Sequence, residues 1–312
     1  MDKIQHKFIQ VGGLNLHVAE IGTGSKVVMV LHGFPEIWYS WRYQMIALAD
    51  AGFRVIVPDY RGFGLSDVPP EPEKTTSKDL IDDLIGILDS LEIAKVVVIG
   101  KDYGVRPAYM LPLLHPERIL GVVTLGVPFV PPGASNFNNL PEGFYICRWQ
   151  EPGRAEADFG RFDAKAVVRS IYIQFSGSEL PIAAENQEVL DVVDSSTPLP
   201  CWFTEEDVAE YGALYQKSGF QTALQVVYRS LHESFDVKEL LVKVPALLIM
   251  GDKDYVLKFP GMEDYIKSGQ AKHFVPKLET VHLPEGSHFV QEQSPDEVNQ
   301  LLLTFLNTHI WT

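Results

Sequence analysis

The sequence predicts an α/β protein with a mostly parallel β-sheet and helices on both of its faces. In the first 130 residues, short and continuously apolar runs alternate with helical patterns. Such runs are typical of parallel strands that are buried on both faces. The alternation stops near residue 131 and resumes near residue 245. A chain of 312 residues is long enough for one large α/β domain that carries an insertion.

The elements of the first 130 residues follow from local patterns. Residues 8–11 and 14–20 are expected to pair as a hairpin, because two glycines separate them. A helix is predicted over residues 77–91, where leucine and isoleucine recur at spacings of three and four. Further strands are predicted at residues 26–32, 54–59, 95–100 and 121–126.

Residues 131–235 are expected to form a helical insertion. They open with a stretch rich in Pro, Gly and Asn, and no convincing buried strand follows. Strands are predicted again at residues 245–251 and 280–284, and a last helix after Ser294, with Pro295 at its first position. The core is therefore expected to comprise residues 1–130 and 236–312.

Composition excludes several classes of protein. Lys and Arg number 26 against 41 Asp and Glu, so the formal net charge is −15. Nucleic acids and anionic membranes both require clustered cations, so neither is an expected partner. The sequence contains no apolar run near the ~20 residues of a membrane helix. Two cysteines do not make a disulfide framework, and we expect a cytoplasmic protein.

The pentapeptide Gly100–Gly104 joins a predicted strand to a predicted helix, with Asp102 at its centre. Small residues on both flanks are typical of a nucleophile elbow, which presents its central side chain at the tip of a strand. Asp102 would then be a nucleophile. The alternative is that Asp102 only caps the following helix, a role in which Asp is common.

Backbone donors and an acid–base pair are expected near the elbow. In elbow enzymes one N–H comes from the residue after the nucleophile, here Tyr103, and another from a loop like the one that contains Phe34. A histidine in a Gly/Ser loop, His288, follows the final strand. Ends of strands are where sites in open α/β sheets lie.

Alternatives remain for both the acid and the histidine. Asp252 and Asp254 lie in the same loop, and either would be suitably placed by sequence. His273 and His282 are the nearest rivals of His288. His282 alternates within a predicted strand, so we expect it to be a packing residue.

These motifs together resemble one known family. The sequence is similar to the α/β-hydrolase-fold epoxide hydrolases in its segments HGFPE (32–36), DYRGFGLSD (59–67), the Asp-centred elbow, GDKDYV (251–256) and GSHFVQEQSP (286–295). The segment FYICRWQEPGRAEADF (144–159) resembles the plant soluble branch. The resemblance covers essentially the whole chain. It implies the α/β-hydrolase fold, with a mostly parallel eight-stranded sheet, helices on both faces and an inserted helical lid.

The resemblance assigns roles residue by residue. It implies that Asp102 is the nucleophile, His288 the base that activates water, and Asp254 the acid that orients this base. Phe34 and Tyr103 match the oxyanion donors. Two lid tyrosines polarise the epoxide in this family and match Tyr145 and Tyr228. The substrate pocket is expected to include His32, Pro35, Trp38 and Trp149, although the two tryptophans could instead be ordinary core residues, since aromatic side chains dominate cores.

The implied reaction converts a small-molecule epoxide to a vicinal diol through a covalent Asp ester, which His-activated water hydrolyses. No metal or organic cofactor is expected, and the protein is expected to be a monomer or homodimer. The alternative is a haloalkane-type dehalogenase with the same nucleophile, which often has Trp where this chain has Tyr103. A ligand-binding receptor of this fold is a further alternative. Such a receptor would usually lack part of the triad, whereas Asp102, Asp254 and His288 are all present here.

One position departs from the family pattern. Lys101 precedes the nucleophile where the family usually has His. A cation there would lower the pKa of Asp102 and reduce its nucleophilicity. We instead expect Lys101 to point to solvent, because a lysine ammonium stays hydrated where it can.

Overall fold

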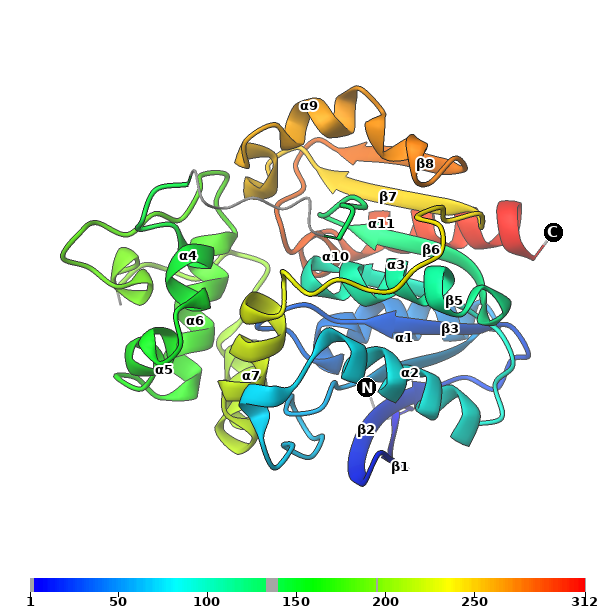
Figure 1. Cartoon of the computed structure of the whole chain (residues 1–312), viewed down its shortest axis with the longest axis horizontal. Helices are drawn as coiled ribbons and strands as arrows, with labels where there is room; N and C mark the ends of the chain where they lie inside the picture. Colours follow the sequence, from blue (N-terminus) through cyan, green and yellow to red (C-terminus); the bar gives the residue numbers. More distant parts are fainter. Residues whose placement is uncertain (1–2, 133–139, 195, 312) are drawn as a thin grey trace.

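The computed structural model describes residues 3–132, 140–194 and 196–311, which are built around an eight-stranded sheet (Figure 1). The strand order is β1-β2-β4-β3-β5-β6-β7-β8. Only the β1–β2 and β2–β4 pairs are antiparallel, so the predicted α/β class and mostly parallel sheet are confirmed. The strands are β1 (Gln5–Val11), β2 (Leu14–Ile21), β3 (Val27–Leu31), β4 (Arg54–Pro58), β5 (Val96–Lys101), β6 (Ile119–Leu125), β7 (Ala246–Gly251) and β8 (Leu278–Leu283).

The helices lie between and beyond the strands. None of those described has the length and apolar character needed to cross a lipid bilayer. The α-helices are α1 (Arg42–Asp50), α2 (Ser77–Ser90), α3 (Val105–Leu114), α4 (Tyr145–Gln150), α5 (Arg154–Phe159), α6 (Ala164–Phe175), α7 (Glu205–Ser218), α8 (Gln221–Leu224), α9 (Met262–Lys267), α10 (Val290–Gln293) and α11 (Pro295–Phe305).

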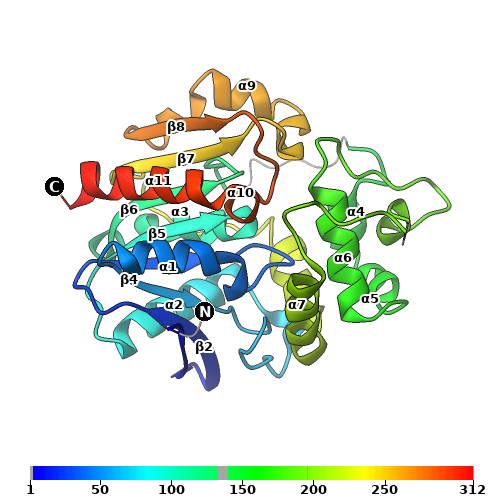
Figure 2. The same ribbon diagram turned by 180° about the vertical axis from the view of Figure 1, so that it is seen from behind.

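Helices cover both faces of the sheet. Helices α2 and α3 pack on one face, and α1 and α11 pack on the other (Figures 1 and 2). The central strand β5 contributes alternate side chains to the two apolar clusters, with Val98 on one face and Ile99 on the other. The predicted helix at 77–91 is confirmed as α2, and Thr76 and Asp79 form a capping box at its first turn.

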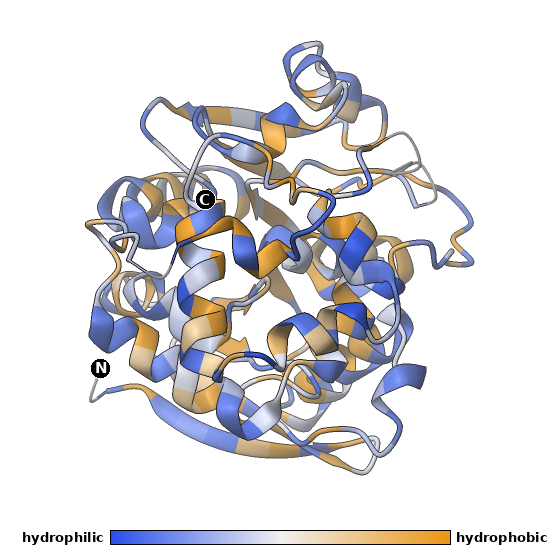
Figure 3. Ribbon diagram, turned by 90° about the vertical axis from the view of Figure 1, so that its left-hand side faces the viewer, coloured by the Kyte–Doolittle hydropathy of each residue, from blue (hydrophilic) through white to orange (hydrophobic). Residues whose placement is uncertain are grey.

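The helical insertion, by which we mean the described part of residues 131–235, lies beyond the carboxyl ends of the parallel strands (Figure 1). Its helices α4 to α8 carry apolar and polar residues side by side (Figure 3). In α6, for example, Val168, Ile171 and Phe175 are buried at helical spacing. These side chains join the apolar cluster of the α2–α3 face, so the insertion and this side of the sheet share one continuous core.

Candidate active site

The turn from β5 into α3 presents Asp102 at the tip of the central strand. Asp102 has a φ of +52°, and only one other non-glycine residue in the described chain has a positive φ. This conformation is strained for an L-residue, and such backbone strain is typical of functional sites. Asp102 begins a short 3₁₀ turn, η3 (Asp102–Gly104), rather than capping α3, whose N-cap residue is Gly104. The helix-cap alternative is therefore wrong.

Close backbone packing holds the elbow against the loop that follows β3. A Cβ atom on Gly104 would lie 2.4 Å from the carbonyl oxygen of Leu31. One on Gly33 would lie 2.5 Å from the Cβ of Asp102. Both positions therefore require glycine. This approach brings the Phe34 amide within reach of the Asp102 carboxylate.

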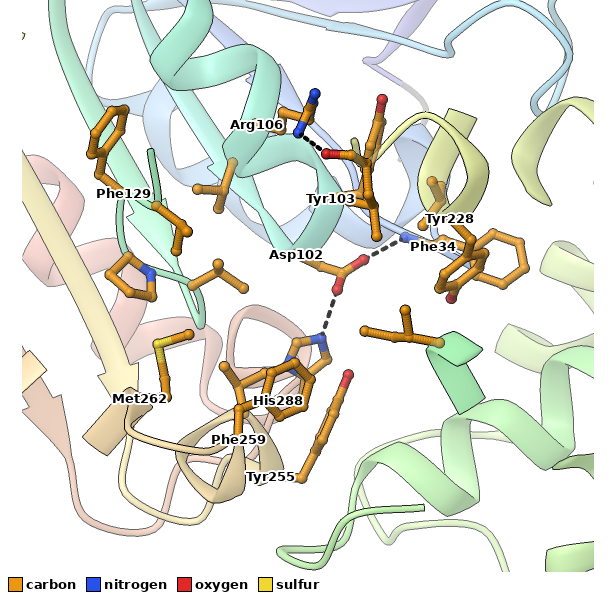
Figure 4. A pocket seen from close by; sticks show the side chains of 18 of the residues that line it. Phe34, Asp102, Tyr103, Arg106, Phe129, Tyr228, Tyr255, Phe259, Met262 and His288 are labelled. Carbon is orange, nitrogen blue, oxygen red and sulfur yellow. Dashed lines mark hydrogen bonds and ion pairs between the residues drawn. The ribbon is translucent and has the colours of Figure 1, made fainter. Parts of the chain in front are cut away.

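Each oxygen of the Asp102 carboxylate has a different partner (Figure 4). The Phe34 N–H donates to Oδ1 at 3.0 Å, and the backbone N–H of Tyr103 also donates to the carboxylate. Oδ2 lies 3.3 Å from Nε2 of His288. Nδ1 of the same imidazole lies 3.0 Å from both oxygens of Asp254. The carboxylate thus sits between two amide donors and an imidazole that a second carboxylate orients.

Charges in this cluster shift the pKa values of its members. Burial alone would raise the pKa of Asp102, but the hydrogen bond and charge of His288, the charge of Lys101 and the Tyr103 amide lower it to about 2. Burial lowers the pKa of His288, but the charge of Asp254 and hydrogen bonds to both carboxylates outweigh burial and raise it above its ordinary value. Asp102 is therefore ionised at neutral pH, as a carboxylate nucleophile must be.

A cavity of about 450 Å³ opens above Asp102 and His288. Tyr145 from α4 and Tyr228 from the π-helical turn η6 (Gln225–Arg229) both line it. Most of the remaining wall is apolar, and it extends on both sides of Asp102 (Figure 4). Apolar lining residues include Met110, Phe129, Ile146, Ile171, Phe175 and Met262.

Contacts on both sides of Tyr228 fix the turn that carries it. Arg106 of α3 donates to the carbonyl oxygens of Ser230, Leu231 and Glu233 at 3.3, 3.1 and 2.8 Å. Within the insertion, Arg229 forms an ion pair with Glu156 at 2.7 Å. These contacts connect the turn that carries Tyr228 to α3, the helix that follows the elbow at Asp102.

The site combines a carboxylate on an elbow, an oriented imidazole, two amide donors and two phenols. Groups of these types are chemically suited to displacement at saturated carbon followed by hydrolysis. A family model described as alpha/beta hydrolase fold matches residues 26–295. Epoxide hydrolase 1 of Siraitia grosvenorii is 38% identical over 98% of this chain and 99% of its own length.

The chain belongs to the α/β-hydrolase fold family, in its epoxide hydrolase branch.

Solved structures of plant epoxide hydrolases match equally fully. The enzyme from Vigna radiata has a TM-score of 0.90 with 36% identity and covers 98% of both chains. Potato epoxide hydrolase I has a TM-score of 0.88 with 32% identity, over 98% of this chain and 99% of its own. The family resemblance seen in the sequence motifs is therefore confirmed along the whole fold.

Within this epoxide hydrolase fold, the prediction that Lys101 points to solvent is wrong. The Lys101 side chain is completely buried, and its Nζ lies 3.1 Å from Oε2 of Glu36, which is equally buried. The ammonium also lies 4.4 Å from the ring centroid of Phe289. A buried carboxylate and an aromatic face replace the water that the ammonium loses.

The four predicted pocket residues do not line the cavity. His32 is buried below the site, where its Nδ1 contacts the Gly33 carbonyl oxygen at 2.9 Å, and Pro35 is buried in the same loop. Trp38 packs toward the N-terminal hairpin, with its ring centroid 6.2 Å from that of His17. Trp149 lies behind the phenols.

Trp149 nevertheless supports the site indirectly. Its ring centroid lies 5.3 Å from that of Tyr145 and 5.1 Å from that of Tyr228. It is four residues after Tyr145 on α4, so the two side chains share one helix face. Trp149 therefore packs against the rings of both phenols that line the cavity.

The rival acid and histidines lie away from Asp102. Asp252 pairs with His282 at 2.7 Å on the surface, so the prediction that His282 is a packing residue is wrong. His282 projects from the exposed side of the edge strand β8, where it lines a shallow surface pocket with Glu263 and Lys267 of α9. His273 is exposed and contacts the carbonyl oxygen of Gln270.

Sequence reasoning missed two residues of the site. Glu36 lies in the HGFPE segment (32–36), but nothing in its spacing connects it to Lys101. Tyr255 directly follows Asp254 and lines the cavity, with its hydroxyl 3.3 Å from that of Tyr145. Its place at the end of a site-forming strand is the only sequence signal that pointed to it.

Proposed function

We propose that the protein hydrolyses epoxides to vicinal diols through a covalent ester of Asp102. The observation that carries this proposal is an ionised carboxylate at the elbow, facing phenols across an apolar cavity. A carboxylate is suited to displace a leaving group from saturated carbon. The phenols supply what an epoxide oxygen needs as it leaves, namely hydrogen bonds and a proton.

In the first step, Oδ2 of Asp102 attacks one epoxide carbon and the carbon–oxygen bond of the ring breaks. Oδ1 is the oxygen that the Phe34 amide already engages, which leaves Oδ2 for attack. Tyr145 and Tyr228 hydrogen-bond the departing oxygen, and one of them transfers its proton to it. General acid catalysis of this kind contributes about 10²–10⁴-fold.

In the second step, Nε2 of His288 removes a proton from water, and the hydroxide attacks the ester carbonyl. The amides of Phe34 and Tyr103 stabilise the resulting oxyanion. Collapse releases the diol and returns the carboxylate of Asp102, and the proton gained from water restores the phenol. The Asp102 carboxylate raises the pKa of His288, and ester formation removes its negative charge. The pKa of His288 therefore falls at this stage, which favours the neutral imidazole that a base requires.

We also propose that residues 131–235 serve as the lid over a core of residues 1–130 and 236–312. The lid supplies both phenols, and the apolar wall favours a neutral epoxide with apolar substituents on both sides of the ring. The mechanism needs no cofactor. We further propose a cytoplasmic location, which the low cysteine content supports, and a protein that is a monomer or homodimer.

A dehalogenase is the weaker alternative. Halide leaves without a proton, so phenols opposite the nucleophile would have no acid to supply. Relatives that match along their whole length are named epoxide hydrolases.

Single turnover in ¹⁸O-water tests the proposal. With enzyme in excess over styrene oxide, the diol of the first turnover should carry unlabelled oxygen, and the label should appear in the peptide that contains Asp102. A parallel incubation with a haloalkane should release no halide. Labelled diol in the first turnover would refute the covalent mechanism, and halide release without epoxide opening would favour the dehalogenase.

A further inference from the structure

Tyr255 places a third phenol in the cavity. It follows Asp254 directly and begins the 3₁₀ turn η7 (Tyr255–Lys258) at the carboxyl end of β7. Only 2% of its surface is exposed. Figure 4 shows its hydroxyl pointing toward the space above Asp102 and His288.

Packing fixes this ring between the core and the insertion. Its centroid lies 4.8 Å from that of the His288 imidazole and 5.0 Å from that of Phe175 in α6. Its hydroxyl is 3.3 Å from the hydroxyl of Tyr145. Tyr228, in contrast, approaches Tyr145 only through its ring, at a centroid distance of 6.1 Å.

The contact between two hydroxyls has a chemical consequence. One phenol must donate and the other must accept, because each carries a single proton. If Tyr255 donates, the proton of Tyr145 stays available for the substrate oxygen. The same hydrogen bond then stabilises the phenolate that forms on Tyr145 when its proton leaves, in an apolar cavity where an unsupported anion is costly.

We propose that Tyr255 is a positioning residue that donates a hydrogen bond to Tyr145 and makes Tyr145, rather than Tyr228, the phenol that transfers its proton. This inference rests on the proposed epoxide hydrolysis. The pKa values agree in direction: burial raises the pKa of Tyr145, and the bond to Tyr255 opposes this rise. For Tyr255 itself, burial and the bond to Tyr145 both raise the pKa, so it keeps its proton.

The test compares single-turnover rates of ester formation in Tyr255→Phe, Tyr145→Phe, Tyr228→Phe and the double variants that combine Tyr255→Phe with each of the others. Rapid quenching and intact-protein mass follow the adduct with styrene oxide. A hydrogen bond to a charged group contributes about 1.5–3 kcal/mol. We therefore expect Tyr255→Phe to slow ester formation about 10- to 150-fold at saturation, with a smaller effect on apparent affinity.

The double variants distinguish a role through Tyr145 from simple packing. Tyr255→Phe should have almost no further effect once Tyr145 is Phe, but should keep its full effect beside Tyr228→Phe. Tyr60→Phe is the matched control, because its buried hydroxyl contacts no described hydrogen-bond partner and it lies outside the cavity wall. This control should react at the wild-type rate.

Two results would overturn this inference and leave the proposed function standing. One is a wild-type rate of ester formation in Tyr255→Phe. The other is that Tyr255→Phe slows ester formation as strongly in the Tyr145→Phe background as in the wild type. A wild-type protein that forms no ester with the epoxide would instead refute the proposed function, and the inference with it.

Discussion

The ammonium of Lys101 and the carboxylate of Glu36 form an ion pair of 3.1 Å that no solvent reaches. Oε2 of Glu36 also accepts the N–H of Gly33 at 3.2 Å. Because Lys101 precedes Asp102 and Gly33 precedes Phe34, this pair connects the turn of Asp102 to the loop whose Phe34 amide donates to the Asp102 carboxylate. The pair therefore stabilises the relative position of the two segments and places a positive charge beside the site.

Replacing Lys101 by Met should destabilise the protein. The substitution leaves the Glu36 carboxylate buried without its cation, and breaking a buried pair in this way costs about 3–5 kcal/mol. Chemical denaturation would measure the loss. Adding Glu36→Gln should recover much of it, because the unpaired charge is then gone. Lys78→Met, which breaks an exposed pair with Asp82, should change stability by less than about 1 kcal/mol. A Lys101→Met protein as stable as the wild type would contradict the structural role of the pair.

Lys101 should also affect the pH dependence of ester hydrolysis. Its charge lowers the pKa of His288, and an imidazole can accept a proton only when it is neutral. Removing the charge with Lys101→Met raises that pKa, so the acid limb of hydrolysis should move to higher pH. The hydrolysis rate of pre-formed ester, measured across a series of pH values, gives the position of the acid limb directly. Lys95→Met removes an exposed lysine next to the same strand and should leave the limb in place; an unmoved limb in Lys101→Met would show that this charge is not felt at His288.

His288→Gln should trap the ester. Attack by Asp102 needs no base, whereas hydrolysis does, and loss of a general base reduces a rate about 10²–10⁴-fold. Mixing this variant with styrene oxide should add the mass of one epoxide to each chain, at the peptide that contains Asp102. His282→Gln alters the surface histidine that pairs with Asp252 and should turn over without accumulating adduct. Absence of adduct in both His288→Gln and wild type would argue against Asp102 as the nucleophile.

Local patterns made the elbow and most of the sheet predictable, whereas contacts between distant segments were not. Flanking glycines indicate the turn at Asp102 because backbone packing there excludes a Cβ atom. The burial of Lys101 depends on Glu36, 65 residues away. Likewise, Tyr255 meets Tyr145 across 110 residues. Such pairs follow from the three-dimensional arrangement of strand ends and the insertion, which no sequence spacing encodes.

A second buried charge cluster joins the core to the insertion. Arg42 of α1 pairs with Glu292 of α10, and also with Asp207 of α7 at 2.9 Å. Glu292 further accepts hydrogen bonds from Tyr172 at 2.9 Å and Tyr211 at 3.2 Å, which belong to α6 and α7. Burial raises the pKa of Glu292 to about 7, although Arg42 opposes this rise.

This raised pKa should make the stability of the protein fall as the pH rises from about 4.5 to about 7. In that interval the folded state keeps the Glu292 proton while the unfolded state has released it, so the stabilisation present below pH 4.5 is lost as pH passes through the folded pKa. At 1.36 kcal/mol per pKa unit, the contribution is on the order of 3 kcal/mol. Glu292→Gln removes the titration and should give a flatter dependence of the denaturation midpoint on pH than the wild type. Glu297→Gln, which removes an exposed carboxylate from the neighbouring helix α11, should retain the wild-type slope. Equal slopes in wild type and Glu292→Gln would mean that Glu292 is ionised in the folded protein throughout this range, with Arg42 outweighing its burial.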